Sequence, residues 1–357
     1  MNDIKDSFLC CKREDNIVKK EWESIELGMK ECLDFDTFCT PGHKGFLDKR
    51  DITEFDGGVL FPAKSVENAE EKARKHYGVK RLKFSVGGSS IAMKWAIWSA
   101  NGDIVAPTFT HKCVREGAIL AKVNLFSFEV GNSGGLAKVP MADDYEKAFD
   151  EHSSAKVAVV TSPDYFGRCT DVKAIKKVCE KRGKLLILDA AHGAHFASST
   201  LLPDGGESVA DFAVMSAHKT LCAYTQSAIG VCNAQEYFDA YDEAVELFGT
   251  TSPSYLLLGS IESAIEREQT YGYKYKTIVD ACRRFRESVP CLDNDDPLRL
   301  VVKSSNAKRL FDELISVKIM PETYYGDYVV FIVTICDDEQ KVEKLKREII
   351  RIENYEG

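Results

Sequence analysis

The sequence predicts an α/β fold in which a large domain with a mainly parallel sheet precedes a small C-terminal α/β domain. Short β-rich apolar runs alternate with amphipathic stretches from residue 82 to residue 233, a pattern typical of a doubly wound sheet. Two of these runs, 185–188 and 212–215, stop abruptly at ionisable residues. Short apolar runs of this kind favour buried parallel strands, whose carboxyl ends carry the chemistry of such sheets.

The elements follow from local patterns along the chain. Helix 65–78 is expected because Val66, Ala69, Ala73 and Tyr77 share one face and Gly78 can end the helix. Residues 131–142 are Gly-rich and are expected to form a loop. The expected strands of the large domain are 82–86, 103–106, 125–129, 157–161, 185–188, 212–215 and 228–233, and its further helices are 91–100, 114–122, 171–183 and 256–268.

After a polar break at 293–297, the alternation resumes as strand 298–303, helix 305–316, strand 328–335 and helix 338–353. We therefore expect an N-terminal arm at 1–34, a large domain at 35–270 and a small domain at 271–357. Trp22, Ile25 and Met29 form an apolar stripe in the arm, which favours packing on the body or on a partner subunit.

Composition narrows the function classes. The net charge of −9, from 47 basic and 56 acidic residues, argues against nucleic acid and anionic membranes as partners. The 12 cysteines are scattered without a CxxC pair or a Cys/His spacing typical of zinc, so no metal is expected. No apolar run approaches the ~20 residues of a membrane span, and the first residues lack the apolar core of a signal peptide. These observations predict a reduced, cytoplasmic protein.

Asp189 and Lys219 end two neighbouring predicted strands and lie 30 positions apart (219 − 189). That spacing accommodates one crossover and an adjacent strand. A lysine and a carboxylate at adjacent strand ends are what pyridoxal 5′-phosphate requires: the amine forms a Schiff base, and the carboxylate keeps the pyridine nitrogen protonated. Taken alone, Lys219 could equally be a surface lysine and Asp189 a helix cap.

Two further stretches fit this cofactor. Residues 87–90, Gly-Gly-Ser-Ser, lie between a strand and a helix N-terminus, where backbone N–H groups, hydroxyls and the helix dipole favour an anion such as phosphate. His111 follows the strand at 103–106 and could stack on a pyridine ring, although a solvent-facing loop histidine is an equal alternative.

The chain resembles the bacterial ornithine/lysine/arginine decarboxylases, which are fold-type-I pyridoxal-phosphate-dependent transferase-like enzymes. The matching runs occur in the family's order over residues 40–335. Cysteine desulfurases also carry an aspartate and a His-Lys pair, but they lack the TPGHKG and TTSPSY runs found in this chain. The runs are TPGHKG (40–45), DITE (51–54), GGSS (87–90), HKCV (111–114), TSPDYFG (161–167), LDAAHGAHF (188–196), SAHKT (216–220) and TTSPSYLLLGSIE (250–262).

The resemblance implies a role for each matching residue. Lys219 holds the cofactor, Asp189 pairs with the pyridine nitrogen, His111 stacks on the ring, and Ala191 and His192 lie beside the ring or the reacting carbons. It also implies a homodimer or higher oligomer with active sites at the subunit interface, because a threonine reaches the neighbouring site. The residues implied to serve the phosphate are Gly88, Ser89, Ser90, Ser216, His218 and, from the neighbouring subunit, Thr250 or Thr251.

The activity expected from the resemblance is decarboxylation of arginine, lysine or ornithine to the amine and carbon dioxide, through an external aldimine and a quinonoid. Lys219 or His218 would return the proton to Cα. The small-molecule amino acid carries a distal cation that needs a carboxylate. Its candidate partners are Asp51, Glu54, Asp56 and Glu322, each of which could equally be a solvated surface carboxylate.

Two alternatives remain open from the sequence. Residues 55–62 depart from the family's usual continuation after DITE, which leaves room for another pyridoxal-phosphate reaction: an aminotransferase, a lyase or a decarboxylase of an unusual amino acid. The short chain would also suit a non-catalytic paralogue that regulates a full-length decarboxylase, although such a subunit would have no need of Lys219, Asp189 and His111.

Overall fold

The structure, a computed structural model, describes residues 24–31, 40–52 and 63–354. Its centre is a seven-stranded sheet in the order β1-β9-β8-β7-β6-β2-β3, in which β9 runs antiparallel to both neighbours and the other pairs are parallel. The prediction of a mainly parallel sheet is confirmed. The strands are β1 (Arg81–Ser85), β2 (Ile104–Pro107), β3 (Leu125–Phe128), β6 (Val157–Thr161), β7 (Leu185–Asp189), β8 (Phe212–Met215) and β9 (Ala228–Cys232).

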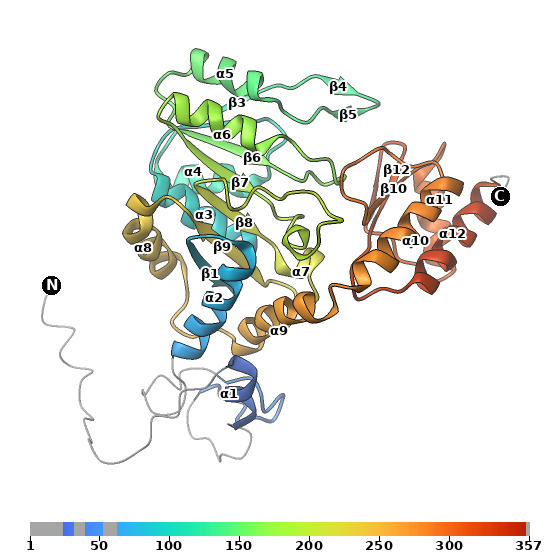
Figure 1. The fold of residues 1–357 in the computed structure, drawn as a ribbon, viewed down its shortest axis with the longest axis horizontal. Helices are drawn as coiled ribbons and strands as arrows, with labels where there is room; N and C mark the ends of the chain where they lie inside the picture. The colour runs from blue at the N-terminus through green and yellow to red at the C-terminus, as the bar shows by residue number, and fades with distance from the viewer. Residues whose placement is uncertain (1–23, 32–39, 53–62, 355–357) are drawn as a thin grey trace, which may run out of the picture.

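Helices cover both faces of this sheet (Figure 1). Because side chains alternate along a strand, Leu186 and Leu188 of β7 pack on one layer and Ile187 on the other. The first layer holds α1 (Ile25–Glu31), α2 (Ala63–Tyr77), α5 (Ala142–Glu151), α6 (Val172–Lys181) and α9 (Tyr255–Tyr271). The second holds α3 (Gly88–Ala100), α4 (Lys112–Ala121) and α8 (Phe238–Phe248).

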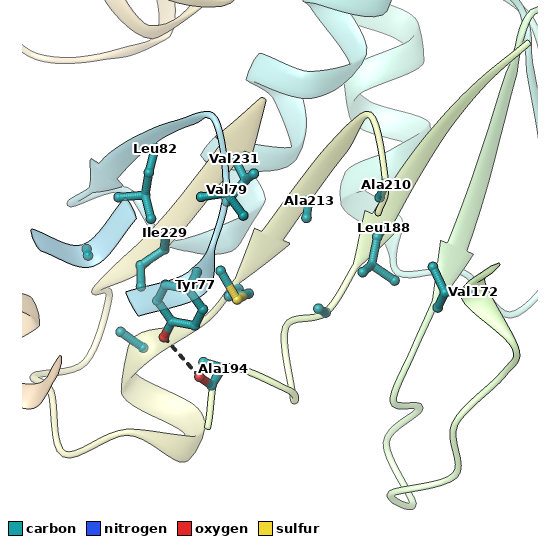
Figure 2. Close-up of a cluster of buried hydrophobic side chains, with 14 of the residues drawn as sticks. Tyr77, Val79, Leu82, Val172, Leu188, Ala194, Ala210, Ala213, Ile229 and Val231 are labelled. Carbon is teal, nitrogen blue, oxygen red and sulfur yellow. Dashed lines mark hydrogen bonds between the residues drawn. The ribbon is translucent and has the colours of Figure 1, made fainter. Parts of the chain in front are cut away.

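The first layer fixes the segment that follows β7. Figure 2 shows Tyr77, at the end of α2, with its hydroxyl donating to the backbone oxygen of Ala194 at 2.9 Å. Leu188, Ala213 and Ile229, from three neighbouring strands, belong to the same apolar cluster and are fully buried. The loop after β7 is therefore held by packing and by a buried hydrogen bond rather than left open to solvent.

A second, smaller sheet lies towards the carboxyl end of the chain, drawn orange to red in Figure 1. Its order is β10-β12-β11, all antiparallel, and it packs with three helices around a separate apolar cluster. The apolar cluster thus changes after α9, and the domain boundary near residue 271 stays a prediction. The elements are α10 (Lys274–Ser288), β10 (Arg299–Lys303), α11 (Ala307–Ser316), β11 (Thr323–Tyr325), β12 (Tyr328–Ile332) and α12 (Glu339–Glu353).

Several elements differ from the sequence prediction. The expected loop at 131–142 contains a short hairpin, β4 (Asn132–Ser133) and β5 (Leu136–Ala137), turned by Gly134 and Gly135 at φ +59° and +79°. Two consecutive positive φ values are typical of a tight hairpin turn and strongly favour glycine. The helices α5, α8 and α10 were not predicted. Short helical turns also occur at α7 (Ala217–Thr220), Phe196–Ser198 and Gln235–Tyr237.

The N-terminal arm packs on the body where the structure describes it. Ile25 and Met29 are buried, and the Ile25 backbone N–H donates to Glu262 Oε2 at 2.8 Å. The expected apolar stripe is thus confirmed for these two residues, while Trp22 lies outside the described residues. Among the described helices, none combines the length and apolar character that a bilayer span would demand.

The expectation that all cysteines are reduced is wrong for one pair. Cys222 and Cys336 form a disulfide, with Cα atoms 6.6 Å apart and a separation of 114 positions in sequence. Cys222 follows α7, and Cys336 follows the last strand of the smaller sheet. The sequence spacing of the two cysteines does not predict this disulfide. The disulfide depends on how the smaller sheet packs against the segment after β8.

Removing this disulfide should destabilise the fold. The C222S/C336S double variant is expected to lose about 2–4 kcal/mol of unfolding free energy, since the bond closes a long loop in the unfolded chain. Urea unfolding of the oxidised wild type, the reduced wild type and the double variant measures the loss. C291S, at a half-buried free cysteine, is the control. Equal unfolding midpoints for oxidised and reduced wild type would contradict the prediction.

Candidate active site

A cavity of about 560 Å³ lies at the carboxyl ends of β6, β7 and β8. Its position agrees with the rule that open α/β sheets bind ligands beyond the carboxyl ends of their strands. The lining residues include most of those that the sequence selected. They are Gly88, Ser89, Ser90, Phe109, His111, Cys113, Leu136, Ala137, Thr161, Asp164, Tyr165, Phe166, Arg168, Asp189, Ala191, His192, His218, Lys219 and Tyr325.

Asp189 ends β7 and lies in register with Val214 of the parallel neighbour β8, which leads into α7 and Lys219. The predicted arrangement of carboxylate and lysine on adjacent strands is therefore present. Burial raises the pKa of the Asp189 carboxyl, while the backbone N–H of Ala191, at 3.2 Å, and the charges of Lys219 and His111 act in the opposite direction. A buried carboxylate facing a cavity favours a ligand that brings a positively charged donor.

Lys219 projects into the cavity from α7. Burial lowers the pKa of its amine, and the positive charge of Arg299 adds to this effect, whereas Asp189 opposes it. Nζ lies 3.1 Å from Nε2 of His192, and Nδ1 of His192 lies 3.3 Å from Nη2 of Arg299. A lowered pKa gives more of the neutral amine, which is the nucleophilic form.

Two hydroxyls meet on one side of the cavity. Ser216 Oγ, at the end of β8, donates to Ser89 Oγ in the first turn of α3 at 2.8 Å. Gly88 begins that helix with φ +76°, and Ser90 follows in the same turn. Hydroxyls at the N-terminus of a 13-residue helix form a site that favours an anion.

The histidines of the site hold defined orientations. His111 caps α4, and its Nδ1 accepts from the backbone N–H of Cys113 at 3.3 Å. His218 Nδ1 lies 2.9 Å from the backbone oxygen of Ser227, so this nitrogen carries the hydrogen. Burial raises the pKa of the neighbouring Cys113 thiol to about 12, which leaves it protonated and unreactive at neutral pH.

The remaining predicted residues lie elsewhere. Thr250 and Thr251 are exposed between α8 and α9 and do not line the cavity of their own chain. Asp51 pairs with His43, Oδ2 to Nε2 at 3.1 Å, and is likewise not a lining residue. Glu322 accepts from the hydroxyl of the lining residue Tyr165 at 2.9 Å. Glu54 and Asp56 lie outside the described residues.

Sequence reasoning missed several residues around the cavity. Leu136 and Ala137 come from the unpredicted hairpin, and Tyr325 comes from the smaller sheet. Arg299 approaches His192 from the first position of β10, where a charged but buried residue directly before the apolar run at 300–302 was the available signal. Tyr165 belonged to a matched run, and its ring meets that of His192 edge to face with centroids 5.2 Å apart.

Comparison with solved structures identifies the fold class. The fold is that of the fold-type-I pyridoxal-phosphate-dependent enzymes. A lysine decarboxylase of Francisella novicida superposes with a TM-score of 0.79 at 18% identity, over 94% of this chain and 60% of that one. A serine palmitoyltransferase of Sphingomonas wittichii gives a TM-score of 0.70 at 14% identity, over 92% of this chain and 83% of that one.

Within this class the chain belongs to the Orn/Lys/Arg decarboxylase family, a family of amino acid decarboxylases, since the model of that family's major domain matches residues 49–317. The resemblance seen in the sequence is confirmed. An arginine decarboxylase of Halalkalibacterium halodurans is 30% identical over 218 residues, which is 58% of this chain and 44% of the relative. The chain thus spans less than half the length of that curated relative.

Proposed function

We propose that this protein decarboxylates a basic amino acid, arginine, lysine or ornithine, with pyridoxal 5′-phosphate held on Lys219. The observation that carries the proposal is the pairing of Lys219 and Asp189 at adjacent strand ends in one cavity. The match to the family's major domain over residues 49–317 supports the reaction and the substrate class.

The residues present fit the cofactor. Asp189 is a buried carboxylate suited to a protonated ring nitrogen, and Lys219 offers an amine with a lowered pKa. Ser89 and Ser216 place two hydroxyls beside a helix N-terminus, with Gly88, Ser90 and His218 around the same side, where the phosphate would bind. His111 and Ala191 line the same cavity and could contact the ring, and His192 lies 3.1 Å from the amine of Lys219 that would hold the cofactor.

The bound cofactor supplies a sink for the electron pair released when the Cα–carboxylate bond breaks. Asp189 would maintain the positive charge that makes this sink effective, because its carboxylate stabilises a protonated ring nitrogen. The carboxylate leaves as carbon dioxide, and one proton must return to Cα. The aromatic and apolar lining from Phe109, Phe166 and Leu136 would limit access of water to the reacting carbon.

Lys219 is the better of the two proposed proton donors. His218 donates through Nδ1 to the Ser227 carbonyl, so Nε2 of the neutral ring has no hydrogen to give. The neutral amine of Lys219 can take up a proton from the incoming α-ammonium group and return it as an ammonium group, and it lies on the cavity side of α7. We therefore assign proton return to Lys219 and a phosphate-binding and orienting role to His218.

Glu322 is the proposed partner for the distal cation of the substrate among the described candidates. It contacts Tyr165, which lines the cavity, and its charge acts on Lys219 and Arg299. E322Q keeps an acceptor for the Tyr165 hydroxyl but removes the charge. KM for the basic amino acid should rise about 10–100-fold with little change in kcat, as expected for loss of a charged hydrogen bond worth about 1.5–3 kcal/mol.

Steady-state kinetics of E322Q beside E287Q, at an exposed carboxylate of α10, test this assignment. E287Q should match the wild type. A lowered kcat with unchanged KM in E322Q would remove Glu322 from the substrate site.

We also propose a homodimer or higher oligomer with active sites at the subunit interface. Phe46 and Leu47, in the loop that follows the TPGHKG run, are 90% and 78% exposed, and Tyr224, in the segment after α7, is half exposed. Apolar side chains at this exposure favour burial against a second copy. Thr250 and Thr251, exposed on their own chain, would then reach the neighbouring site. Light scattering coupled to size-exclusion chromatography measures the oligomer.

Release of carbon dioxide tests the proposed reaction. Purified protein loaded with pyridoxal phosphate is incubated separately with carboxyl-labelled arginine, lysine, ornithine and a set of neutral and acidic amino acids. We expect labelled carbon dioxide and the matching amine from one basic amino acid. Substrate consumption without carbon dioxide would replace decarboxylation by another reaction of the same cofactor.

A further inference from the structure

Arg299 is a buried cation that the proposed chemistry does not use. It is 1% exposed, and among the described residues its Nε and Nη1 atoms are buried without a hydrogen-bond partner. Its Nη2 meets Nδ1 of His192 at 3.3 Å. Burying a guanidinium with unpaired N–H groups costs folding free energy, and such exceptions in a native structure call for a functional reason.

The contact with Arg299 determines which ring nitrogen of His192 carries a hydrogen. A guanidinium has only donors, so Nδ1 of His192 must accept. A doubly protonated ring is excluded here because burial, together with the charges of Arg299 and Lys219, holds the pKa of His192 well below its usual range. The neutral ring therefore carries its hydrogen on Nε2.

That tautomer determines the form of Lys219 that fits beside it. Nε2 lies 3.1 Å from Nζ of Lys219, and a protonated Nε2 needs an acceptor there. A neutral amine has a lone pair and can accept, whereas an ammonium group has only donors and would face the N–H directly. The chain of contacts from Arg299 through His192 to Lys219 is satisfied when Lys219 is neutral.

We infer that Arg299 is a positioning residue that fixes the tautomer of His192 and thereby selects the neutral, nucleophilic amine of Lys219. The inference rests on the proposed role of Lys219 as the cofactor-binding amine. Arg299 acts from the smaller sheet on His192, which lies in the segment after β7 of the larger sheet. Cofactor attachment would thus depend on correct packing of β10 against the segment after β7.

Other titratable and charged groups also act on Lys219, and the test variants leave them unchanged. His192 additionally faces His195 and His218. The groups that act on Lys219 from the surrounding elements are Asp189 at the end of β7, Cys113 of α4, Arg299 of β10 and Glu322 before β11. A simple charge effect of Arg299 would also favour the neutral amine, so the experiment has to separate that effect from one transmitted through His192.

The test is the pH dependence of Lys219 acetylation in protein stripped of cofactor. Short pulses of acetic anhydride are given across a pH series, and Lys219 is quantified by peptide mass spectrometry with exposed Lys181 as the internal reference. R299M should raise the reaction midpoint of Lys219 by about one pH unit, because the neutral amine is no longer selected. R299K, which keeps a donor and a charge, should restore part of the low midpoint.

A double-mutant cycle shows whether Arg299 acts on Lys219 through His192 or directly through its charge. H192F keeps an aromatic ring beside Tyr165 but has no ring nitrogens, so R299M in that background should shift the midpoint by well under half as much. Equal midpoint shifts in the wild-type and H192F backgrounds would mean that Arg299 acts only through its charge, which would overturn the inference. The absence of any midpoint shift in R299M would also overturn it. R286M is the matched control, since Arg286 also supports this strand through the Arg299 backbone oxygen at 3.0 Å. An equal shift in R286M would assign the effect to a distorted strand.

Nitrogen NMR of histidine-labelled wild-type protein keeps the inference testable if R299M does not fold. The ring signals of His192 are identified by their response to acetylation of Lys219. A protonated Nε2 with unprotonated Nδ1 is expected, and the opposite tautomer would overturn the inference. Both measurements are independent of substrate, so they hold or fail separately from the carbon dioxide assay that tests the proposed decarboxylation.

Discussion

K219A is expected to abolish stable cofactor binding and to reduce carbon dioxide release by about 10⁴-fold or more. The amine is the proposed point of covalent attachment and the proposed proton donor to Cα, so one substitution removes both contributions. Losses of this size are typical when an enzyme loses its nucleophile. Absorbance of the dialysed, cofactor-loaded protein and the labelled carbon dioxide assay measure the two effects.

K181A is the control for this prediction, because Lys181 is exposed at the end of α6. It should bind cofactor and release carbon dioxide like the wild type. K219A protein that retains the cofactor after dialysis and turns over normally would contradict the assignment of Lys219.

D189N should lower kcat on the order of 10²–10³-fold while changing KM much less. Asparagine matches aspartate in shape but cannot stabilise a protonated ring nitrogen, so the bound cofactor becomes a weaker electron sink. The estimate corresponds to removing one preorganised electrostatic contact to charge that develops in the transition state. Steady-state kinetics with the substrate identified in the panel measure the change.

D211N is the matched control for this second prediction. Asp211 precedes β8 and pairs with Lys176 at 2.6 Å while also accepting from the Leu186 backbone N–H at 2.8 Å. Its loss should reduce stability but leave kcat close to the wild-type value. Equal losses of kcat in D189N and D211N would attribute the effect of D189N to damage to the sheet rather than to the cofactor's electronic state.

The sequence was sufficient to predict the larger sheet and the centre of the site because both depend on local patterns. Asp189 and Lys219 each follow a short apolar run, and parallel strands bring such ends to the same edge. The helix α10 was missed although its buried residues, Ile278, Cys282 and Phe285 among them, repeat at helical spacing. That spacing is itself enough to predict the helix.

The rest of the site depends on contacts that no local pattern encodes. Arg299 and His192 lie 107 positions apart, and their contact requires the smaller sheet to pack against the segment after β7. The same holds for the disulfide between Cys222 and Cys336 and for Glu322, whose link to the cavity runs through Tyr165. Asp51 was selected for its charge, and its pairing with His43 became visible only in the fold.

The measurement that tests the account most directly is mass spectrometry of the protein after loading with pyridoxal phosphate and reduction with borohydride. Reduction makes a lysine-bound cofactor permanent, so the modified peptide identifies its attachment point. We predict one cofactor per chain, on Lys219. Modification spread over surface lysines with Lys219 unmodified, in folded protein, would contradict the account.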